Sequence, residues 1–173
     1  SPSDRFNLAN FLFIAGKHEE SAAEFHKALE LSPDFRWNAR LPFIAVLVTL
    51  QRFDEAQAET LKLPEGAPRD HGLALLYHAP GHEAESDAAL ARLATLPVEP
   101  GSVILAEIYA FRGMKEKAMA ALIAARDAAR NVQGPPEQVL IQLAYMQDDM
   151  LRSQHFKVLH DDPRWAELTA DPE

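Results

Sequence analysis

Four short turn-like segments recur along the chain, and their spacing constrains the fold more than any other feature. The lead residues of these segments are 35, 30 and 32 positions apart. Self-similarity at a period of about 20–50 residues indicates a chain built from stacked supersecondary units. The segments are GKHEES from Gly16, QRFDEA from Gln51, PGHEAES around Gly81 and RGMKEKA around Gly113.

Apolar and small residues lie three and four positions apart on both sides of each turn, which predicts two amphipathic helices per unit. A glycine in the turn can adopt a left-handed backbone and end the first helix. Alanine or serine early in the second helix allows the two helix axes to approach closely. The pattern is clearest in the first unit, in Leu8, Ala9, Leu12, Gly16, Ser21, Phe25, Ala28 and Pro33.

This pattern resembles the tetratricopeptide repeat, a helix–turn–helix unit of about 34 residues. The second unit matches least well, because Thr60 and Leu63 stand where an aromatic residue and alanine are usual. The resemblance implies an all-α fold, a right-handed superhelical array of about four repeats with C-terminal capping helices. The expected repeats are 3–33, 36–66, 68–97 and 100–131, and the cap is 132–173.

The cap begins with a proline-rich helix start at 134–137, followed by EQVLIQLAYMQDDML with helical apolar spacing. A terminal repeat is expected to be atypical and to carry a more polar outer face. Asp161 or Asp162 is the predicted N-cap of a last short helix, whose Trp165 and Leu168 we expect to pack against the preceding helices. This ending is similar to the tails of bacterial tetratricopeptide proteins.

Composition and charge exclude several functional classes. The 173 residues are 47% hydrophobic and 25% charged, which is typical of a globular chain. A net charge of −9 disfavours nucleic acid as a partner, and no apolar run is long enough to span a membrane. The absence of cysteine excludes disulfides and thiolate chemistry. It fits both the cytoplasm, which we slightly favour, and the periplasm.

No motif predicts catalysis, a metal or a cofactor. His78 and His82 are four residues apart, but Ala79-Pro80-Gly81 between them should end a helix. The acidic pairs at 19–20 and 161–162 suit helix starts, and neighbouring residues such as those at 148–149 point about 100° apart on a helix. Phosphate-loop, dinucleotide, nucleophile-elbow and HExxH motifs are absent from the sequence. We therefore expect a protein without enzymatic activity.

The resemblance places partner binding on the concave face, which the first helix of each repeat lines. We expect there a mostly apolar trough with asparagine and histidine as polar points, suited to an extended peptide or a helix. Packing of these residues by the cap or by neighbouring molecules is the alternative. The predicted residues are Phe6, Asn7, Asn10, Phe13, Leu41, Ala45, Val48, His71, Leu75, His78, Val103, Glu107 and Phe111.

The carboxylate clamp of chaperone-binding tetratricopeptide domains is missing. Asn10 matches one clamp asparagine, but Phe6 replaces the lysine, and Pro42, Pro68 and Gly72 stand where polar or basic residues belong. The predicted function is therefore recognition or scaffolding of another protein or peptide of unknown identity.

Two alternatives remain open at this point. The chain could be a regulatory or sensory helical domain attached to a catalytic or transcription-regulator domain, as the Ser1-Pro2 start of a piece of a larger protein would suggest. It could also be a self-association module, which an exposed face of Phe6, Phe13 and Phe111 would favour.

Overall fold

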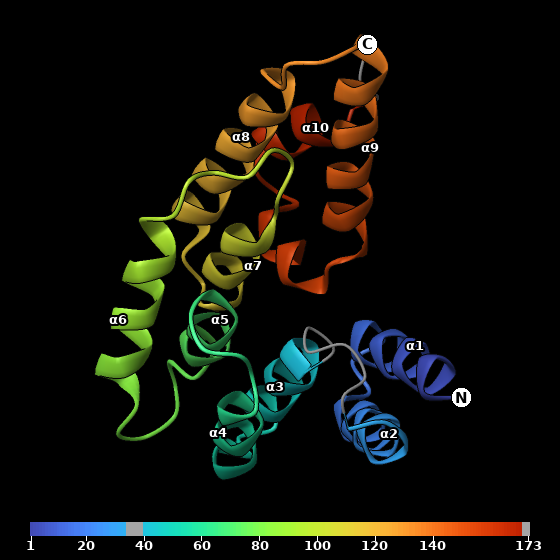
Figure 1. Ribbon diagram of the computed structural model, residues 1–173, viewed down its shortest axis with the longest axis vertical. Coiled ribbons are helices and arrows are strands. Elements are labelled where there is room, and N and C mark those ends of the chain that lie inside the picture. Colours follow the sequence, from blue (N-terminus) through green and yellow to red (C-terminus); the bar gives the residue numbers. More distant parts are fainter. Residues whose placement is uncertain (34–39, 171–173) are drawn as a thin grey trace. The chain divides into compact units, whose positions relative to one another are not determined.

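The structure is a computed structural model that describes residues 1–33 and 40–170. These residues form helices and no strands, which confirms the all-α prediction. The predicted start of the second repeat at residue 36 and the last three residues of the cap lie outside the described residues. The helices are α1 (Pro2–Ile14), α2 (His18–Leu31), α3 (Arg40–Thr49), α4 (Phe53–Leu61), α5 (Ala67–Leu75), α6 (Glu83–Ala94), α7 (Ile104–Phe111), α8 (Lys115–Arg130), α9 (Pro136–Arg152), η2 (Gln154–Leu159) and α10 (Pro163–Thr169) (Figure 1).

The first eight helices pack in consecutive pairs, α1 with α2, α3 with α4, α5 with α6 and α7 with α8. In each pair, the second helix carries a small residue that is completely buried at its contact with the first helix. These residues are Ser21, Ala56, Ser86 and Ala118. The two serine hydroxyls donate to the first helix, from Ser21 Oγ to the Ala9 carbonyl at 2.7 Å and from Ser86 Oγ to the Ala74 carbonyl at 3.1 Å. A larger side chain would separate the two axes, so the small residues determine how closely the helices pack.

The four turns share one backbone conformation. Gly16, Gln51, Gly81 and Gly113 have positive φ angles of 76°, 59°, 82° and 72°. The left-handed conformation reverses the chain after the first helix, as predicted for the glycines. Gln51 is the one residue other than glycine with such a backbone in the described ranges, and this conformation costs an L-residue roughly 1–2 kcal/mol.

A charged contact also recurs, with an offset of 35 residues. In the first pair, Arg5 Nη1 lies 2.7 Å from Glu24 Oε2, and Lys27 Nζ contacts the same carboxylate. In the second pair, Arg40 and Lys62 contact Glu59 in the same way. The matching interactions indicate that the two hairpins repeat in structure as well as in sequence.

The chain divides into two compact units, unit 1 from Ser1 to Ala94 and unit 2 from Thr95 to Glu173. Unit 1 contains the first three helix pairs. Its helix α3 is buried from Phe43 to Val48, and Phe43 packs on Phe25 of α2 with ring centroids 5.7 Å apart. Thr60, which weakened the sequence match of the second repeat, is fully buried and donates its hydroxyl to the Ala56 carbonyl at 2.8 Å.

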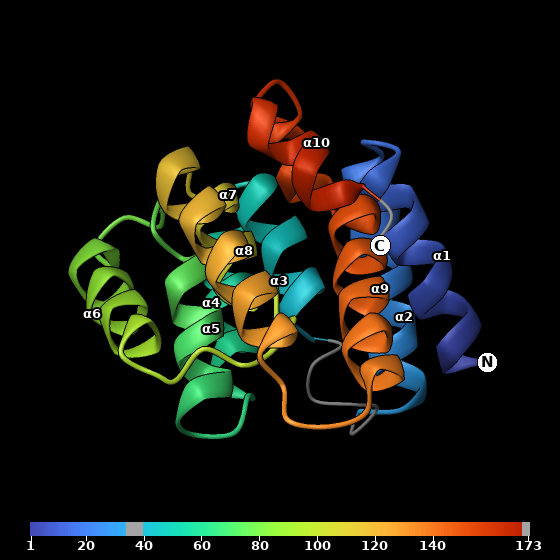
Figure 2. The ribbon, with the colours of Figure 1, turned by 90° about the horizontal axis from the view of Figure 1, so that it is seen from above.

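Unit 2 combines the fourth helix pair with the predicted cap. Figures 1 and 2 show α8 alongside α9, and η2 packs against α7 and α8. Asp162 caps α10 by accepting from the Arg164 backbone N–H at 2.9 Å, and Trp165 and Leu168 are buried against the fourth pair, which confirms both expectations. The shared core consists of Val103, Ala106, Ala110, Ala118, Met119, Leu122, Ala125, Met146, Met150, Phe156, Leu159, Trp165 and Leu168.

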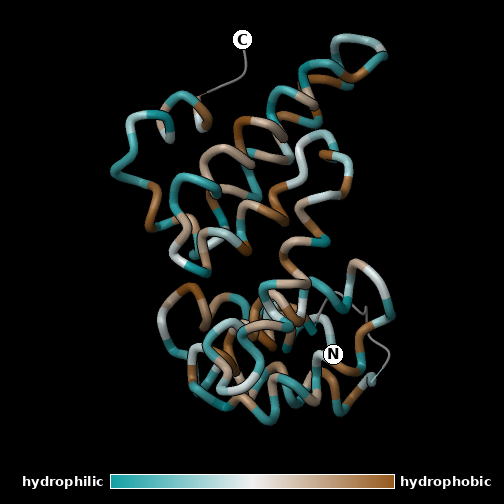
Figure 3. Tube along the Cα trace, turned by 90° about the vertical axis from the view of Figure 1, so that its left-hand side faces the viewer, coloured by the Kyte–Doolittle hydropathy of each residue, from teal (hydrophilic) through white to brown (hydrophobic). Residues whose placement is uncertain are grey.

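The outer face of α9 is mixed in character. Leu143, Met146 and Met150 of this helix face the core, whereas Ile141 and Tyr145 are exposed, together with charged residues such as those at 148, 149 and 152. Helical spacing identified the apolar residues of this helix but did not distinguish the buried ones from the exposed ones. Figure 3 shows hydrophobic residues interspersed with hydrophilic ones along the helices.

No helix in the described part of the chain combines the length and the apolar character needed to cross a membrane.

Candidate functional site

Three predicted residues form a row of equivalent positions in unit 1. Phe6 of α1, Leu41 of α3 and His71 of α5 are 35 and 30 residues apart, the same intervals as the turns. All three are half-buried, so part of each side chain remains accessible. The Phe6 ring also packs edge-on against Phe25, with centroids 5.6 Å apart. We call Phe6, Leu41 and His71 the first-helix row.

The polar points predicted beside this row are also accessible. Asn7 and His78 are exposed, and Asn10 is half-buried. The Asn10 side-chain amide donates to the Phe6 carbonyl at 3.0 Å. This hydrogen bond holds Asn10 along α1, with its amide oxygen left as an acceptor.

Four other predicted residues of unit 1 belong to its core. Phe13, Ala45, Val48 and Leu75 are each 5% exposed or less. These residues are apolar, as expected for the lining of a trough, but in this fold their side chains pack between helices and are not available to a ligand. The accessible part of the predicted surface in unit 1 is therefore the first-helix row with its asparagines and His78.

In unit 2 the predicted residues meet the cap. Val103 is buried in the shared core. Glu107 forms a hydrogen bond with Ser153, where α9 ends, and the Phe111 ring packs edge-on against His155 of η2 with centroids 5.1 Å apart. Ser153 and η2 thus cover the face of α7 that carries Glu107 and Phe111, which is the cap packing that the sequence left open as an alternative.

Burial changes the ionisation of two groups at this contact. Desolvation, with a contribution from the Asp149 carboxylate, raises the pKa of Glu107 to about 7 despite the Ser153 hydrogen bond. Desolvation also lowers the pKa of His155 to about 4, because the charged imidazolium is disfavoured there. Sequence analysis missed His155 and Ser153, which lie more than 40 residues from α7 and carry no motif.

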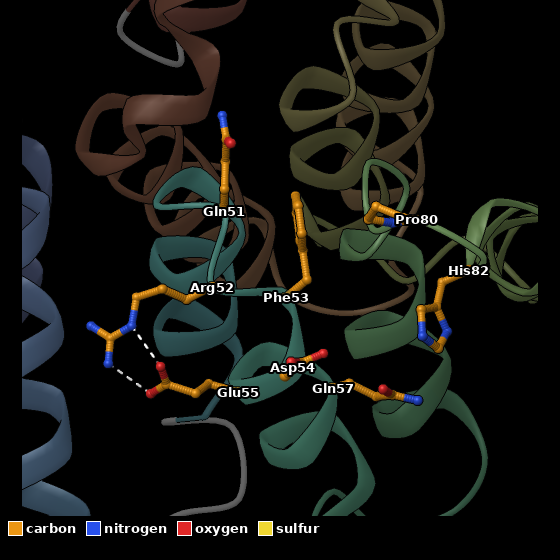
Figure 4. Close-up of a pocket in the computed structure, with 8 residues that line it drawn as sticks. All are labelled: Gln51, Arg52, Phe53, Asp54, Glu55, Gln57, Pro80 and His82. Atoms are coloured by element: carbon orange, nitrogen blue, oxygen red, sulfur yellow. Dashed lines mark hydrogen bonds and ion pairs between the residues drawn. The ribbon is translucent and has the colours of Figure 1, made fainter.

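A polar hollow of about 340 Å³ lies beside the turns of the second and third helix pairs (Figure 4). Arg52 points toward Glu55, and its Nε and Nη2 atoms each lie 2.7 Å from a Glu55 carboxylate oxygen. The side chain of Gln51, with its left-handed backbone, belongs to the lining. The lining residues are Gln51, Arg52, Phe53, Asp54, Glu55, Gln57, Pro80 and His82.

The charges of this hollow are largely engaged with each other. Arg52 contacts Glu55 and, at 3.6 Å, Glu19, and His82 Nδ1 lies 3.4 Å from Glu85. Nothing in the sequence predicted the hollow, because its lining comes from two turns about 30 residues apart. Among residues 1–33 and 40–170, no group of three or more histidine, aspartate or glutamate side chains is arranged to hold a metal ion.

Comparison with models of known protein families gave no match to this chain. Searches among curated proteins and among solved structures also found no similar protein.

Proposed function

We propose that this chain is a tetratricopeptide-like interaction module without catalytic activity, and that unit 1 binds a peptide or helix of another protein. The observation that carries the proposal is the first-helix row, in which three successive hairpins present Phe6, Leu41 and His71 at equivalent, partly exposed positions. A repeated scaffold presents side chains at regular intervals, which suits an extended ligand.

The geometry of packed helices indicates the form of the ligand. α3 and α5 pack against each other, and the axes of packed helices lie about 8–10 Å apart. An extended peptide rises about 3.3 Å per residue, so residues three apart would reach from Leu41 on α3 to His71 on α5. In a bound helix, residues seven apart are separated by about 10.5 Å and would span the same distance.

The chemistry of the row indicates which ligand side chains it would accept. Phe6 and Leu41 offer apolar contact, Asn7 and Asn10 offer hydrogen bonds beside Phe6 on α1, and His71 offers an imidazole on α5. We therefore expect a ligand in which an apolar side chain that meets Leu41 is followed, at the spacing given above, by a polar one that meets His71.

The test is selection of binding peptides from a random library, followed by titration against a double variant, Leu41→Ala with His71→Ala. We expect the variant to lose at least about tenfold in affinity, or ~1.4 kcal/mol, because two of three contact positions are truncated. Fluorescence anisotropy of a labelled peptide measures the affinity, and far-UV circular dichroism verifies that the helices remain folded.

A matched control truncates the same residue types on second helices. Leu61 of α4 is 58% exposed and His26 of α2 is exposed, so Leu61→Ala with His26→Ala should leave the affinity unchanged. Equal affinity of the selected peptides for the Leu41/His71 variant and the wild type would refute the first-helix row as the binding surface.

A further inference from the structure

The second turn differs from the other three turns at two positions, and both of these residues line the polar hollow. Gln51 has the left-handed backbone that glycine adopts in the other turns. Phe53 is the first residue of α4, whereas α2, α6 and α8 begin with the polar residues His18, Glu83 and Lys115. The repeat therefore requires neither a glutamine nor a phenylalanine here. Residues that break a local rule without serving the fold concentrate at functional sites.

Three side chains of the lining are free to meet a ligand. Among residues 1–33 and 40–170, the Asp54 carboxylate makes no hydrogen bond or ion pair, the Gln57 amide makes no hydrogen bond, and the Phe53 ring contacts no other ring. Asp54 is exposed, and Phe53 and Gln57 are half-buried. Gln57 lies three residues after Asp54, and residues at this spacing are neighbours on a helix surface.

The polar hollow has an apolar end and a polar end. Figure 4 shows Phe53 and Pro80 toward one end of it, and Asp54, Gln57 and His82 toward the other. The two ends come from the starts of two second helices, so a ligand between them would contact both hairpins. The arrangement suits a ligand with an apolar stem and a polar head.

The polar end is rich in hydrogen-bond acceptors. His82 Nδ1 lies 3.4 Å from Glu85 Oε2, and a carboxylate can only accept, so the proton of the neutral imidazole is on Nδ1 and Nε2 is an acceptor. The Asp54 carboxylate and the Gln57 amide oxygen are further acceptors. A ligand head with several N–H donors would satisfy these groups.

The charge of the lining favours a cation. The Arg52 guanidinium contacts Glu55 at 2.7 Å and lies 3.6 Å from Glu19, so its charge is already balanced. The Asp54 carboxylate adds a negative charge that no cation in the described part of the chain neutralises. The start of α4 contributes a partial positive charge of only about half an elementary charge, and Asp54 and Glu55 lie in its first turn.

We propose that the polar hollow binds a guanidinium group, presented by an arginine side chain of a peptide. Guanidinium is planar and always charged, and its five N–H donors match a carboxylate in a bidentate manner. Asp54 accepts two of these donors, Gln57 and His82 accept others, and the methylene stem of the arginine packs on Phe53 and Pro80. The volume of about 340 Å³ is at the lower end of the range of ligand sites, ~300–1,000 Å³, which suits one side chain.

This site shares no residue with the first-helix row, so the proposal does not rest on the proposed function. It also predicts a preference between the two basic side chains. The ammonium group of lysine has three donors and holds its hydration shell more strongly than guanidinium does. Lysine should therefore bind more weakly than arginine.

The test is an NMR titration with three tripeptides that carry arginine, citrulline or lysine between two glycines and have blocked ends. We expect the arginine peptide to shift the backbone amide signals of residues 51–57 and 80–82 in a saturable way. Citrulline has nearly the shape of arginine without its charge and should leave these signals unchanged. The lysine peptide should bind at least about threefold more weakly than the arginine peptide.

Two variants test the acceptors of the site. Asp54→Asn keeps the size of the side chain and removes its charge, so the arginine peptide should lose at least about tenfold in affinity. Gln57→Glu adds a carboxylate at the polar end and should increase the affinity at least about threefold. This gain cannot result from misfolding, which far-UV circular dichroism checks in both variants.

Glu83→Gln is the matched control, because Glu83 is an exposed carboxylate at the start of α6 that does not line the polar hollow. It removes the same charge as Asp54→Asn and should change the affinity by less than about twofold. The Leu41/His71 double variant should also bind the arginine peptide like the wild type, which distinguishes a failure of this site from a failure of the first-helix row.

Several results would overturn the proposal. Equal binding of the arginine and citrulline peptides would show that the charge is not recognised, and equal binding of the lysine peptide would exclude a guanidinium-specific site. Wild-type affinity in Asp54→Asn, or no gain in Gln57→Glu, would exclude the polar hollow as the binding site. Tighter binding of the free amino acid arginine than of the tripeptide would exclude a peptide as the source of the guanidinium group.

Discussion

Glu107 and His155 show how a residue's role depends on contacts that its local sequence does not contain. Glu107 lies on α7 in a position predicted to meet a ligand, yet it meets Ser153 and the Asp149 carboxylate of the cap. His155 lies against Phe111, one turn further along the same helix. Burial favours the neutral form of both residues, which raises the pKa of Glu107 to about 7 and lowers that of His155 to about 4.

These opposite pKa shifts predict opposite effects of pH on stability. The raised pKa of Glu107 means that the folded state binds the proton more tightly, so this group's contribution is complete below about pH 4.5 and is lost as the pH rises to about 7. The lowered pKa of His155 gives a contribution that is complete above about pH 6.5 and is lost as the pH falls to about 4. Glu107→Gln should therefore raise the free energy of unfolding at pH 8 by roughly 2–3 kcal/mol.

Urea unfolding at several pH values between 4 and 8 measures both effects. In Glu107→Gln the stability should rise with pH between about 4 and 6.5, and in His155→Phe it should fall with pH between about 4.5 and 7. Glu137→Gln, an exposed carboxylate on α9, is the control and should follow the wild type. The same pH profile for Glu107→Gln and the wild type would show that the Glu107 carboxyl is not desolvated.

At the scale of the elements, each hairpin depends on one small residue where its helices cross. Ser21 and Ser86 use this position to hydrogen-bond the first helix, and Ala56 and Ala118 fill it without a polar group. Serine and alanine alternate at this position along the four hairpins, so the common requirement is a small side chain. The hydroxyl group adds a hydrogen bond in only two of the hairpins.

The crossing position predicts a size-dependent loss of stability. Ser21→Val should destabilise the fold by about 1–3 kcal/mol, because a β-branched side chain overpacks a fully buried position and the 2.7 Å hydrogen bond to Ala9 is lost. Ser21→Ala should cost about 1 kcal/mol or less, since it removes only the hydrogen bond. Urea denaturation measures both, with Ala23→Val as a control at an exposed position of α2. Equal losses for Ser21→Val and Ala23→Val would contradict close packing at the crossing.

At the scale of the whole molecule, the chain divides between its third and fourth helix pairs. The segment between α6 and α7 carries the exposed residues Leu96 and Val98. The fourth pair shares a core with α9, η2 and α10, so the cap stabilises this pair rather than simply ending an array.

Limited proteolysis should therefore cut first between α6 and α7. Thermolysin cleaves before large apolar residues unless proline follows them, so Val98 offers such a site outside any helix, whereas Leu96 is followed by Pro97 and does not. We expect two resistant fragments, one ending near residue 97 and one containing the rest of the chain, identified by mass spectrometry. A first cut inside a helix of either unit would contradict the division.

Much of the repeat could be predicted, because its determinants are local. The four turn residues all adopt the left-handed backbone, even Gln51, because the turn is short and leaves few other conformations. The N-cap at Asp162 and the proline start of α9 were predicted for the same reason, since capping depends on neighbours within one helical turn.

Accessibility could not be predicted in this way. Phe13, Ala45, Val48 and Leu75 have the same apolar character as Leu41, yet they are buried while Leu41 is half exposed. The spacing of apolar residues identifies a helix face, but it does not state how many neighbours pack on the helix. The exposure of Phe11 on α1 and of Tyr145 on α9 escaped prediction for the same reason.

The sequence by itself determined the all-α class, the helix pairs, their turns and the small residues at their crossings, because each depends on residues within about one hairpin. Only the tertiary structure decided where the units divide, which first-helix residues remain accessible, and that Glu107 and Phe111 meet the cap. Those contacts join residues more than 40 positions apart, and their free energies depend on burial and packing that no local pattern encodes.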